Sequence, residues 1–213
     1  TTILSFGTPN VNISPIDLLI GYPTNLILTW ENRKKLDSKV YLPLIALVII
    51  GSIPGVFMLK NVNTSIIKLI FGVVVIVLGL EMLLREYSKD SGKSSRILLA
   101  IIGVASGVLC GLFGVGALLA AYVSRVTDDS SSSFKANISA VFIVDNTFRI
   151  ILYSTLHILT LDTLKRGLIL IPFVLIGLIA GMKYSSIMNK NLAKKITALL
   201  LVISGISLVI KNI

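Results

Sequence analysis

Charge, cysteine and histidine are all scarce in this chain of 213 residues. Charged side chains make up 14% of the sequence and hydrophobic ones 54%, whereas a soluble domain carries about 25% charged residues. So few charges cannot cover a surface in water, so the bilayer must surround most of the chain. The single cysteine, Cys110, excludes an intramolecular disulfide and a thiolate cluster for zinc or iron–sulfur. With only one histidine as well, we expect neither a metal site nor a cofactor.

The sequence also lacks the short motifs of common enzymes. It has no Walker loop, HExxH zinc motif or serine-hydrolase elbow. Its net charge of +10 lies almost wholly in short loops between apolar runs. Such loops are typical of the cytoplasmic side of a membrane protein, beside anionic lipid, and no separate basic domain suggests nucleic-acid binding. We therefore expect a multi-pass protein of the cell membrane that is not an enzyme and has no nucleic-acid partner.

Apolar runs of membrane-spanning length are abundant. A span needs about 20 apolar residues to cross about 30 Å of hydrocarbon. The run at 97–123 would be about 40 Å long as a helix, too long for one upright span, and the glycines at 110–116 permit a break within it. The sequence thus predicts an all-α, polytopic membrane helix bundle of about seven segments. They are expected at 14–30, 40–59, 66–84, 97–123, 136–153, 167–182 and 196–211.

Two stretches of the chain resemble each other at a distance of 126 residues. The glycines Gly51 and Gly55, for example, recur as Gly177 and Gly181. The positions that recur are Lys39, Leu42, Leu44, Ile45, Val48, Ile50, Gly51, Gly55, Asn63, Lys68, Ile70 and Gly79. A duplicated bundle is a common architecture of transporters, which bind a solute between two related halves.

The duplication divides the chain into unequal parts. We predict a first repeat at 1–88, a polar linker at 89–96 and a second repeat at 97–213. Only the second opens with a glycine-broken helix, so we expect a second glycine-rich string upstream of Thr1. The loop charges fit better if the 97–123 segment dips into the membrane and returns, which makes the repeats inverted. A single crossing, which makes them parallel, stays open.

The glycine string is the first candidate binding element. A broken helix exposes backbone N–H groups and a positive helix N-terminus, which attract an anion, provided that protein shields the irregular backbone from lipid. Gly111, Gly114 and Gly116 are therefore predicted as backbone donors to a substrate anion. The alternative interpretation is close helix packing through small residues, which is common in membrane helices.

Polar side chains within apolar runs are the second set of candidates. Asp145 and Arg149 are four residues apart and share a helix face, where ionisable groups are expensive and usually face a cavity or a partner. Arg149 is predicted to bind an oxyanion, and Asp145 to orient it or to take a coupling proton. A purely structural ion pair is the alternative. The supporting polar groups are expected to be Asn25, Asn137, Ser139 and Asn146.

These features together resemble the TauE/SafE family of sulfite exporter-like permeases. Its pattern has two homologous halves, each opening with a glycine-rich break of the form G-x-x-G-x-G-G. Here residues 111–117 read GLFGVGA, so Ala117 replaces the last glycine. The stretch ANISAVFIVDNTFRIILY at 136–153 is similar to the family's span that ends in Arg and Tyr. The further matches are the two Gly-x-x-x-Gly spans and the short basic loop before a last helix, with Lys194, Lys195 and Gly205.

The resemblance implies export or uptake of a small sulfur oxyanion or organosulfonate, such as sulfite or sulfoacetate. We expect alternating access between the two repeats, with a small anionic solute and the lipid bilayer as partners; a homo-oligomer stays open. Two other functions also stay open. One is a membrane scaffold or assembly protein without flux, and the other is a membrane-embedded thiol enzyme that uses Cys110.

Overall fold

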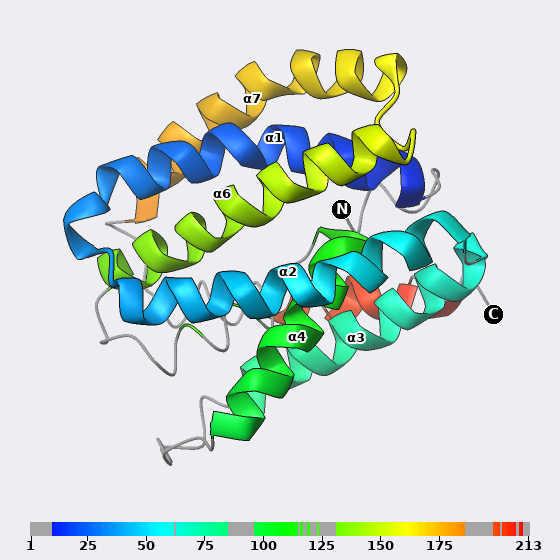
Figure 1. Ribbon diagram of the computed structural model, residues 1–213, viewed down its shortest axis with the longest axis horizontal. Helices are drawn as coiled ribbons and strands as arrows, with labels where there is room; N and C mark the ends of the chain where they lie inside the picture. Colours follow the sequence, from blue (N-terminus) through cyan, green and yellow to red (C-terminus); the bar gives the residue numbers. More distant parts are fainter. Residues whose placement is uncertain are drawn as a thin grey trace.

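A computed structural model describes most of the chain, and its regular structure is helical throughout the described part (Figure 1). The described residues are 10–61, 63–84, 96–114, 116, 119, 123, 131–185, 198–200, 202–207 and 209–210. The helices are α1 (Asn10–Glu31), the 3-10 turn η2 (Arg33–Lys35), α2 (Ser38–Asn61), α3 (Thr64–Leu84), α4 (Arg96–Phe113), α6 (Ser131–Thr155) and α7 (Leu161–Ser185). The predicted all-α membrane bundle is confirmed.

The apolar runs fold into helices close to where they were expected. Three helices of the described chain are long and apolar enough to cross a membrane, at Ser38–Asn61, Ser132–Thr155 and Leu161–Lys183. The long run at 97–123 is interrupted, because α4 ends at Phe113, inside the glycine string. Gly114 follows with a φ of 68°, a left-handed conformation that glycine adopts without steric cost and that commonly ends a helix.

The order of packing places α1 and α6 at the centre of one layer. Across Figure 1 the helices follow one another as α7, α1, α6 and α2, and each packs on its neighbour. Ser14 near the start of α1 meets Tyr153 near the end of α6. At the other end of the same pair, Asn137 of α6 bonds to the backbone of Lys35 and Asp37, beyond the end of α1. α1 and α6 are therefore antiparallel, the orientation that inverted repeats would have.

Glycines bring α2 and α4 into direct backbone contact. A Cβ added at Gly51 would lie 2.9 Å from the Cα of Gly107, and one added at Gly111 would lie 3.0 Å from the Cα of Gly55. Small residues that let two backbones approach are the usual means of helix association in a membrane. These contacts fix the position of α4 along α2. The end of α4 at Phe113 is therefore also fixed in position beside the α1–α6 pair.

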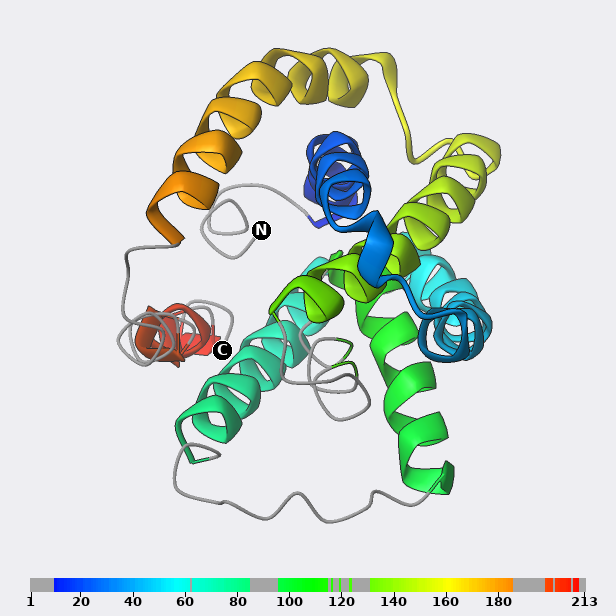
Figure 2. The same cartoon turned by 90° about the vertical axis from the view of Figure 1, so that its left-hand side faces the viewer.

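The helical residues near the C-terminus, red in Figure 2, pack on α3 in a reciprocal way. A Cβ added at Gly79 would meet Ala198 and Val202, and one added at Gly205 would meet Gly72 and Ile76. Adding 126 to the number of Gly79 gives Gly205, and subtracting 126 from Ala198 and Val202 gives Gly72 and Ile76. The two contacts are therefore equivalent under the 126-residue repeat. Two copies related by a twofold axis would produce this contact, although the division into repeats stays a prediction.

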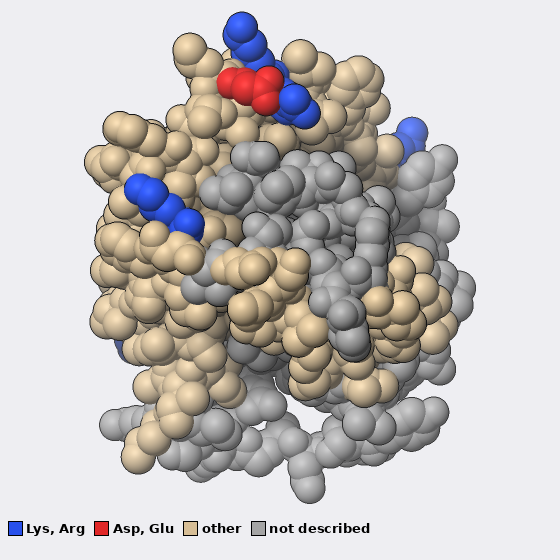
Figure 3. All heavy atoms as spheres, turned by 90° about the vertical axis from the view of Figure 1, so that its right-hand side faces the viewer, with Lys and Arg blue, Asp and Glu red and all other residues tan. Residues whose placement is uncertain are grey.

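The outer surface suits lipid. Large apolar side chains of α7, such as Phe173 and Ile176, are 68% and 67% exposed, and charged atoms are sparse among the described atoms of the face in Figure 3. Lipid tails solvate such side chains, so their exposure needs no further explanation in a membrane protein.

Candidate functional site

A buried polar cluster lies where α1, α2, α4 and α6 meet. It consists of Ser14, Ser52, Asp145, Arg149 and Tyr153, none of which is more than 1% exposed. We call it the Arg149 cluster. Polar and charged side chains inside a membrane protein are costly, and they usually mark a solute or ion pathway. The cluster contains Asp145 and Arg149 from the predicted site and adds three residues to them.

Arg149 directs its hydrogen bonds mainly at neutral hydroxyls. Its Nη2 donates to Ser14 Oγ at 2.9 Å and to Tyr153 Oη at 2.8 Å. Its Nη1 lies 3.8 Å from Asp145 Oδ2, and its buried Nε has no hydrogen-bond partner among the described residues. The positive charge is therefore only loosely matched by a carboxylate, and part of the donor fork is unused.

Asp145 is held away from Arg149 by a bond of its own. Ser52 Oγ of α2 donates to Asp145 Oδ1 at 2.6 Å. The other oxygen, Oδ2, is buried and accepts no hydrogen bond from the described part of the chain. Oδ2 and Arg149 Nε thus both keep unused hydrogen-bonding capacity within one cluster. Buried polar atoms without a partner are rare in native structures.

Tyr153 connects the cluster to α4, and the sequence analysis did not identify it as a site residue. Its hydroxyl donates to the carbonyl of Gly111 at 3.2 Å and lies 2.8 Å from Ser14 Oγ. The spacing 145–149–153 places three residues on one face of α6, which is the signal that the sequence offered. The partners Ser14 and Ser52 come from other helices and could not be inferred from that spacing.

The glycine string includes the C-terminal end of α4, and this end of the helix contacts the Arg149 cluster. The Gly114 N–H bonds to the Cys110 carbonyl at 2.8 Å, and a Cβ added at Gly114 would lie 3.7 Å from Arg149 Nη2. The carbonyl end of α4, where the helix dipole is negative, therefore lies beside the guanidinium and stabilises its charge. In this conformation the Gly114 N–H is not free, so its role as a donor to the anion stays a prediction.

The other two glycines of the string are in close packing. Gly111 lies against Gly55 of α2, and Gly116 lies against the ring of Phe142. Both contacts are what helix packing through small residues requires, the alternative that the sequence left open. A role for Gly111 and Gly116 as backbone donors stays a prediction.

Asn25 and Asn146 come together at a second polar spot between α1 and α6. A Cβ added at Gly21 would lie 3.9 Å from Asn25 Nδ2 and 4.0 Å from Asn146 Nδ2. Neither amide side chain has a hydrogen bond to the described residues, although Asn146 is only 5% exposed. Both amides lie at the interface of the central helix pair, and their role in binding a solute stays a prediction.

Asn137 and Ser139 are not brought to the Arg149 cluster. They precede Arg149 on α6 by twelve and ten residues, which corresponds to about 18 and 15 Å along the helix. Asn137 Nδ2 donates to the Ser133 carbonyl at 2.8 Å, and its Oδ1 accepts from the Asp37 N–H at 2.9 Å. These bonds fasten the connection between α1 and α2 onto the start of α6, which is a structural task.

Cys110 lies beside the same cluster. It is fully buried and interacts electrostatically with Asp145 and Arg149. A thiol enclosed in this way is not accessible to a substrate in the observed conformation. Within the described residues, no group of three or more His, Cys, Asp or Glu side chains could hold a metal ion.

A helical membrane bundle with a buried cationic polar cluster beside a broken helix is an arrangement typical of membrane transporters. The chain belongs to the sulfite exporter TauE/SafE family, whose model matches residues 1–208. Comparisons with curated proteins and with solved structures found no match. At the level of the family, the chain is a multi-pass membrane transporter of sulfur anions.

Proposed function

We propose that the chain moves a small sulfur oxyanion or organosulfonate, such as sulfite or sulfoacetate, across the cell membrane, with Arg149 as the anion-binding group. The observation that supports this is the buried guanidinium of Arg149, which keeps a free Nε and has its nearest described carboxylate 3.8 Å away. A guanidinium fork matches the geometry of an oxyanion and binds it through parallel, charge-assisted hydrogen bonds.

The neighbours of Arg149 suit the same ligand. The hydroxyls of Ser14 and Tyr153 both accept from Nη2 at present, and a hydroxyl can turn its proton towards an arriving anion. Asp145 is held in place by Ser52, and as a carboxylate it would repel an anion bound at the guanidinium. Asp145 is the proposed acceptor of a coupling proton, because neutralising it would remove that repulsion.

The proposed transport cycle is alternating access between the two repeats. The Arg149 cluster combines residues of α1 and α2 with residues of α6, so it spans the proposed boundary between the repeats. All five of its side chains are sealed from solvent, which corresponds to an occluded state. A displacement of α1 against α6 would separate Ser14 from Arg149 and open the cluster. Asn25 and Asn146 are the proposed polar groups along the path, and Asn137 and Ser139 lie further towards one end.

The test is sulfite efflux from proteoliposomes that contain the purified chain. Arg149→Gln is expected to lower the flux by at least about 100-fold, because two hydrogen bonds to a charged group contribute about 1.5–3 kcal/mol each and about 1.4 kcal/mol corresponds to a factor of ten. Arg166→Gln is the matched control, since Arg166 is also paired with an aspartate four residues earlier but is 65% exposed. Equal flux in the wild type and Arg149→Gln would remove Arg149 from the mechanism.

The same assay separates the proposal from its alternatives. Cys110→Ala is expected to retain flux, whereas a thiol enzyme would lose its activity. Wild-type proteoliposomes without flux of either sulfite or sulfoacetate would favour a membrane scaffold. Competition by sulfate and by chloride ranks the anions by charge and shape, and it narrows the substrate within the class.

A further inference from the structure

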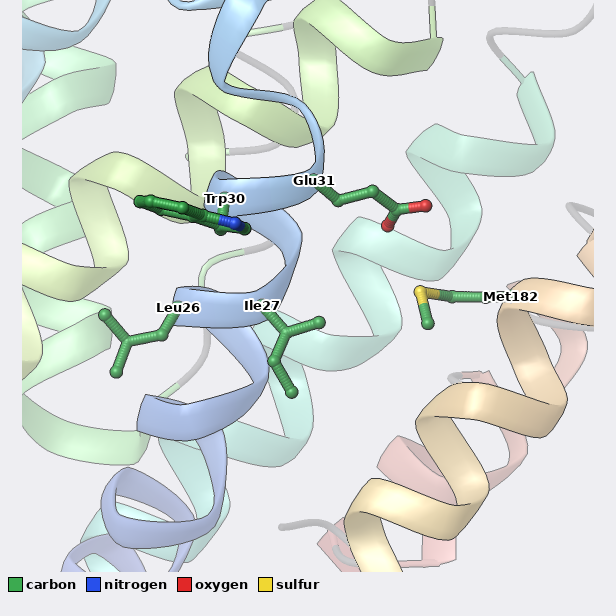
Figure 4. A pocket seen from close by; sticks show the side chains of 5 residues that line it. All are labelled: Leu26, Ile27, Trp30, Glu31 and Met182. Carbon is green, nitrogen blue, oxygen red and sulfur yellow. The ribbon is translucent and has the colours of Figure 1, made fainter.

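The Arg149 cluster is closed on all sides in the described structure. None of its five side chains is more than 1% exposed. The groove between α1 and α7, of about 530 Å³, is lined by Leu26, Ile27, Trp30, Glu31 and Met182 (Figure 4). None of these residues belongs to the cluster. A solute can therefore reach Arg149 only after the surrounding helices separate, and the contacts that hold α6 on its neighbours control this step.

Ser52 of α2 contacts two of these helices through one hydroxyl group. Its Oγ lies 2.6 Å from Asp145 Oδ1 of α6 and 3.3 Å from the Gly107 carbonyl oxygen of α4, and both of these oxygens are acceptors. A serine hydroxyl carries a single proton, so the two oxygens compete for it. The shorter distance indicates that Ser52 donates to Asp145 in this structure.

The charge of Asp145 determines which acceptor is favoured. A hydrogen bond to a carboxylate is roughly twice as strong as one between neutral groups, so the ionised Asp145 keeps the Ser52 proton. A further proton can add to Asp145 Oδ2, which accepts no hydrogen bond from the described residues. The bond from Ser52 to Oδ1 is then a neutral one, and the Gly107 carbonyl is an acceptor of similar strength.

The position of Ser52 in the fold connects this competition to helix movement. Ser52 follows Gly51, which lies against α4, because a Cβ added at Gly51 would be 2.9 Å from the Gly107 Cα. α2 and α4 are therefore one packed unit, and the Gly107 carbonyl lies inside it. When Ser52 donates to Asp145, it attaches α6 to this unit. When Ser52 donates to Gly107, the bond stays within the unit and α6 loses its attachment.

We propose that Ser52 is a positioning residue that holds α6 on the α2–α4 unit while Asp145 is ionised and releases α6 when Asp145 takes a proton. The inference rests on the proposed function, in which this proton is the coupling proton. It comes from the aqueous phase, adds to Asp145 Oδ2 and returns to water when the cycle resets, so no other reactant is needed. Ser52 thus connects proton coupling to the helix movement that opens the Arg149 cluster.

Cys110 provides a probe for this movement, because it is the only cysteine of the chain and is fully buried beside Asp145 and Arg149. A maleimide can reach the thiol only when the surrounding structure opens. The labelling rate is measured in detergent from about pH 8 to about pH 5, where folded proteins are commonly most stable. It is divided by the rate of the unfolded chain at the same pH, which removes the pH dependence of the thiol reaction itself.

Other ionisable groups surround Asp145 and also respond to pH. Those from α6, α4 and α1 are Arg149, Tyr153, Cys110 and Asp17. The basic turn η2 and the ionisable side chains of α2, which are Lys39, Tyr41 and Lys60, lie at the ends of α1 and α2. Asp145→Asn identifies the part of the response that belongs to Asp145, because its side chain stays neutral at every pH.

The normalised rate of the wild type is expected to rise about tenfold on acidification, as one hydrogen bond to a charged group is lost. Asp145→Asn should label at the fast rate at every pH. Ser52→Ala should also label fast, and the double variant Ser52→Ala/Asp145→Asn should be no faster than either single variant. Ser52→Thr keeps the hydroxyl and should retain the response to pH.

Ser106→Ala is the matched control. Ser106 of α4 is as fully buried as Ser52, but its hydroxyl has no hydrogen-bond partner among the described residues. Its removal tests the loss of a buried hydroxyl alone, so the slow rate and the response to pH should both be retained. Equal effects of Ser106→Ala and Ser52→Ala would overturn the proposal.

Two further results would overturn it, namely a wild-type rate that does not depend on pH and additive effects of Ser52→Ala and Asp145→Asn. The first of these decides the question even if Ser52→Ala does not fold. Labelling needs neither a substrate nor flux, so it is independent of the proposed function. Proteoliposomes without flux whose labelling follows the expected pattern would contradict transport and support the role of Ser52. Flux together with labelling that is independent of pH would contradict the role of Ser52 alone.

Discussion

Two aspartate–arginine pairs with the same four-residue spacing lie in the consecutive helices α6 and α7 and differ in almost every other respect. Asp162 and Arg166 of α7 are 69% and 65% exposed, and their charged atoms are 2.8 Å apart. Asp145 and Arg149 of α6 are almost fully buried, yet their charged atoms are 3.8 Å apart. The buried pair, in which mutual neutralisation is needed most, is thus the looser one.

The cause lies in what surrounds the buried pair. Arg149 donates to the hydroxyls of Ser14 and Tyr153, and Asp145 accepts from Ser52. Each partner is therefore oriented by a third residue instead of by the other. A pair that only stabilised the fold would gain from direct contact, because burial makes an unmatched charge expensive. The separation supports the proposal that Arg149 binds an anion.

The largest predicted difference between the pairs is in stability. Arg149→Leu leaves the buried Asp145 without its cation and is expected to destabilise the protein by about 3–5 kcal/mol. Arg166→Leu removes a surface interaction and is expected to change stability by no more than about 0.5 kcal/mol. Thermal unfolding in detergent measures both.

The double variant Asp145→Leu/Arg149→Leu separates stability from function. Replacing both partners of a buried pair by apolar side chains is often neutral or stabilising, so the double variant is expected to recover most of the melting temperature. It should nevertheless lack sulfite flux. If the double variant regained both stability and flux, the Asp145–Arg149 pair would have only a structural role. The buried and the exposed pair would then not differ in function.

A smaller effect is expected from the hydroxyl that helps to hold the buried pair apart. Tyr153→Phe removes the hydrogen bonds of this hydroxyl to Arg149, to Ser14 and to the Gly111 carbonyl. The bond that orients Arg149 is one of the three, and a typical hydrogen bond contributes about 1 kcal/mol. We expect flux to fall about fivefold, because the guanidinium is less well oriented and can approach Asp145 more closely. Tyr22→Phe is the control, as the Tyr22 hydroxyl bonds to Thr147 at an exposed position. Equal losses in the two variants would show that the orientation of Arg149 does not matter.

The fold could be predicted further from the sequence than the site could. Run lengths and the low charge content predict a helical bundle, and the glycines at 110–116 predict the interruption that ends α4 at Phe113. These are local properties, because each helix satisfies its own backbone hydrogen bonds. Which end of a broken helix lies at the anion site, the N-terminal or the carbonyl end, depends on how the helices pack and not on the local sequence. The glycine string predicts a positive helix N-terminus at the anion site, whereas the described end beside Arg149 is the carbonyl end of α4.

From the sequence, only site residues that lie on the same helix could be predicted to lie together. Asp145 and Arg149 share a face of α6, and their spacing made them visible. Ser14 and Ser52 reach the same cluster from α1 and α2, and no single sequence links serines to a charge 135 or 93 residues away. Asn137 illustrates the converse, because a polar residue in the same helix faces the connection between α1 and α2 and is bonded there.

The smallest predicted effect concerns the exposed pair and provides the reference for the others. An exposed pair with four-residue spacing contributes about 0.3–0.5 kcal/mol, and Asp162 also lies in the first turn of α7, where a negative charge is favourable. Asp162→Asn is therefore expected to lower the melting temperature by about 1–2 °C in low salt and by less in 1 M salt, where surface charges are screened. Flux should not change. A clear loss of flux in Asp162→Asn would mean that α7 acts on the solute directly, and burial would then no longer distinguish the functional pair from the structural one.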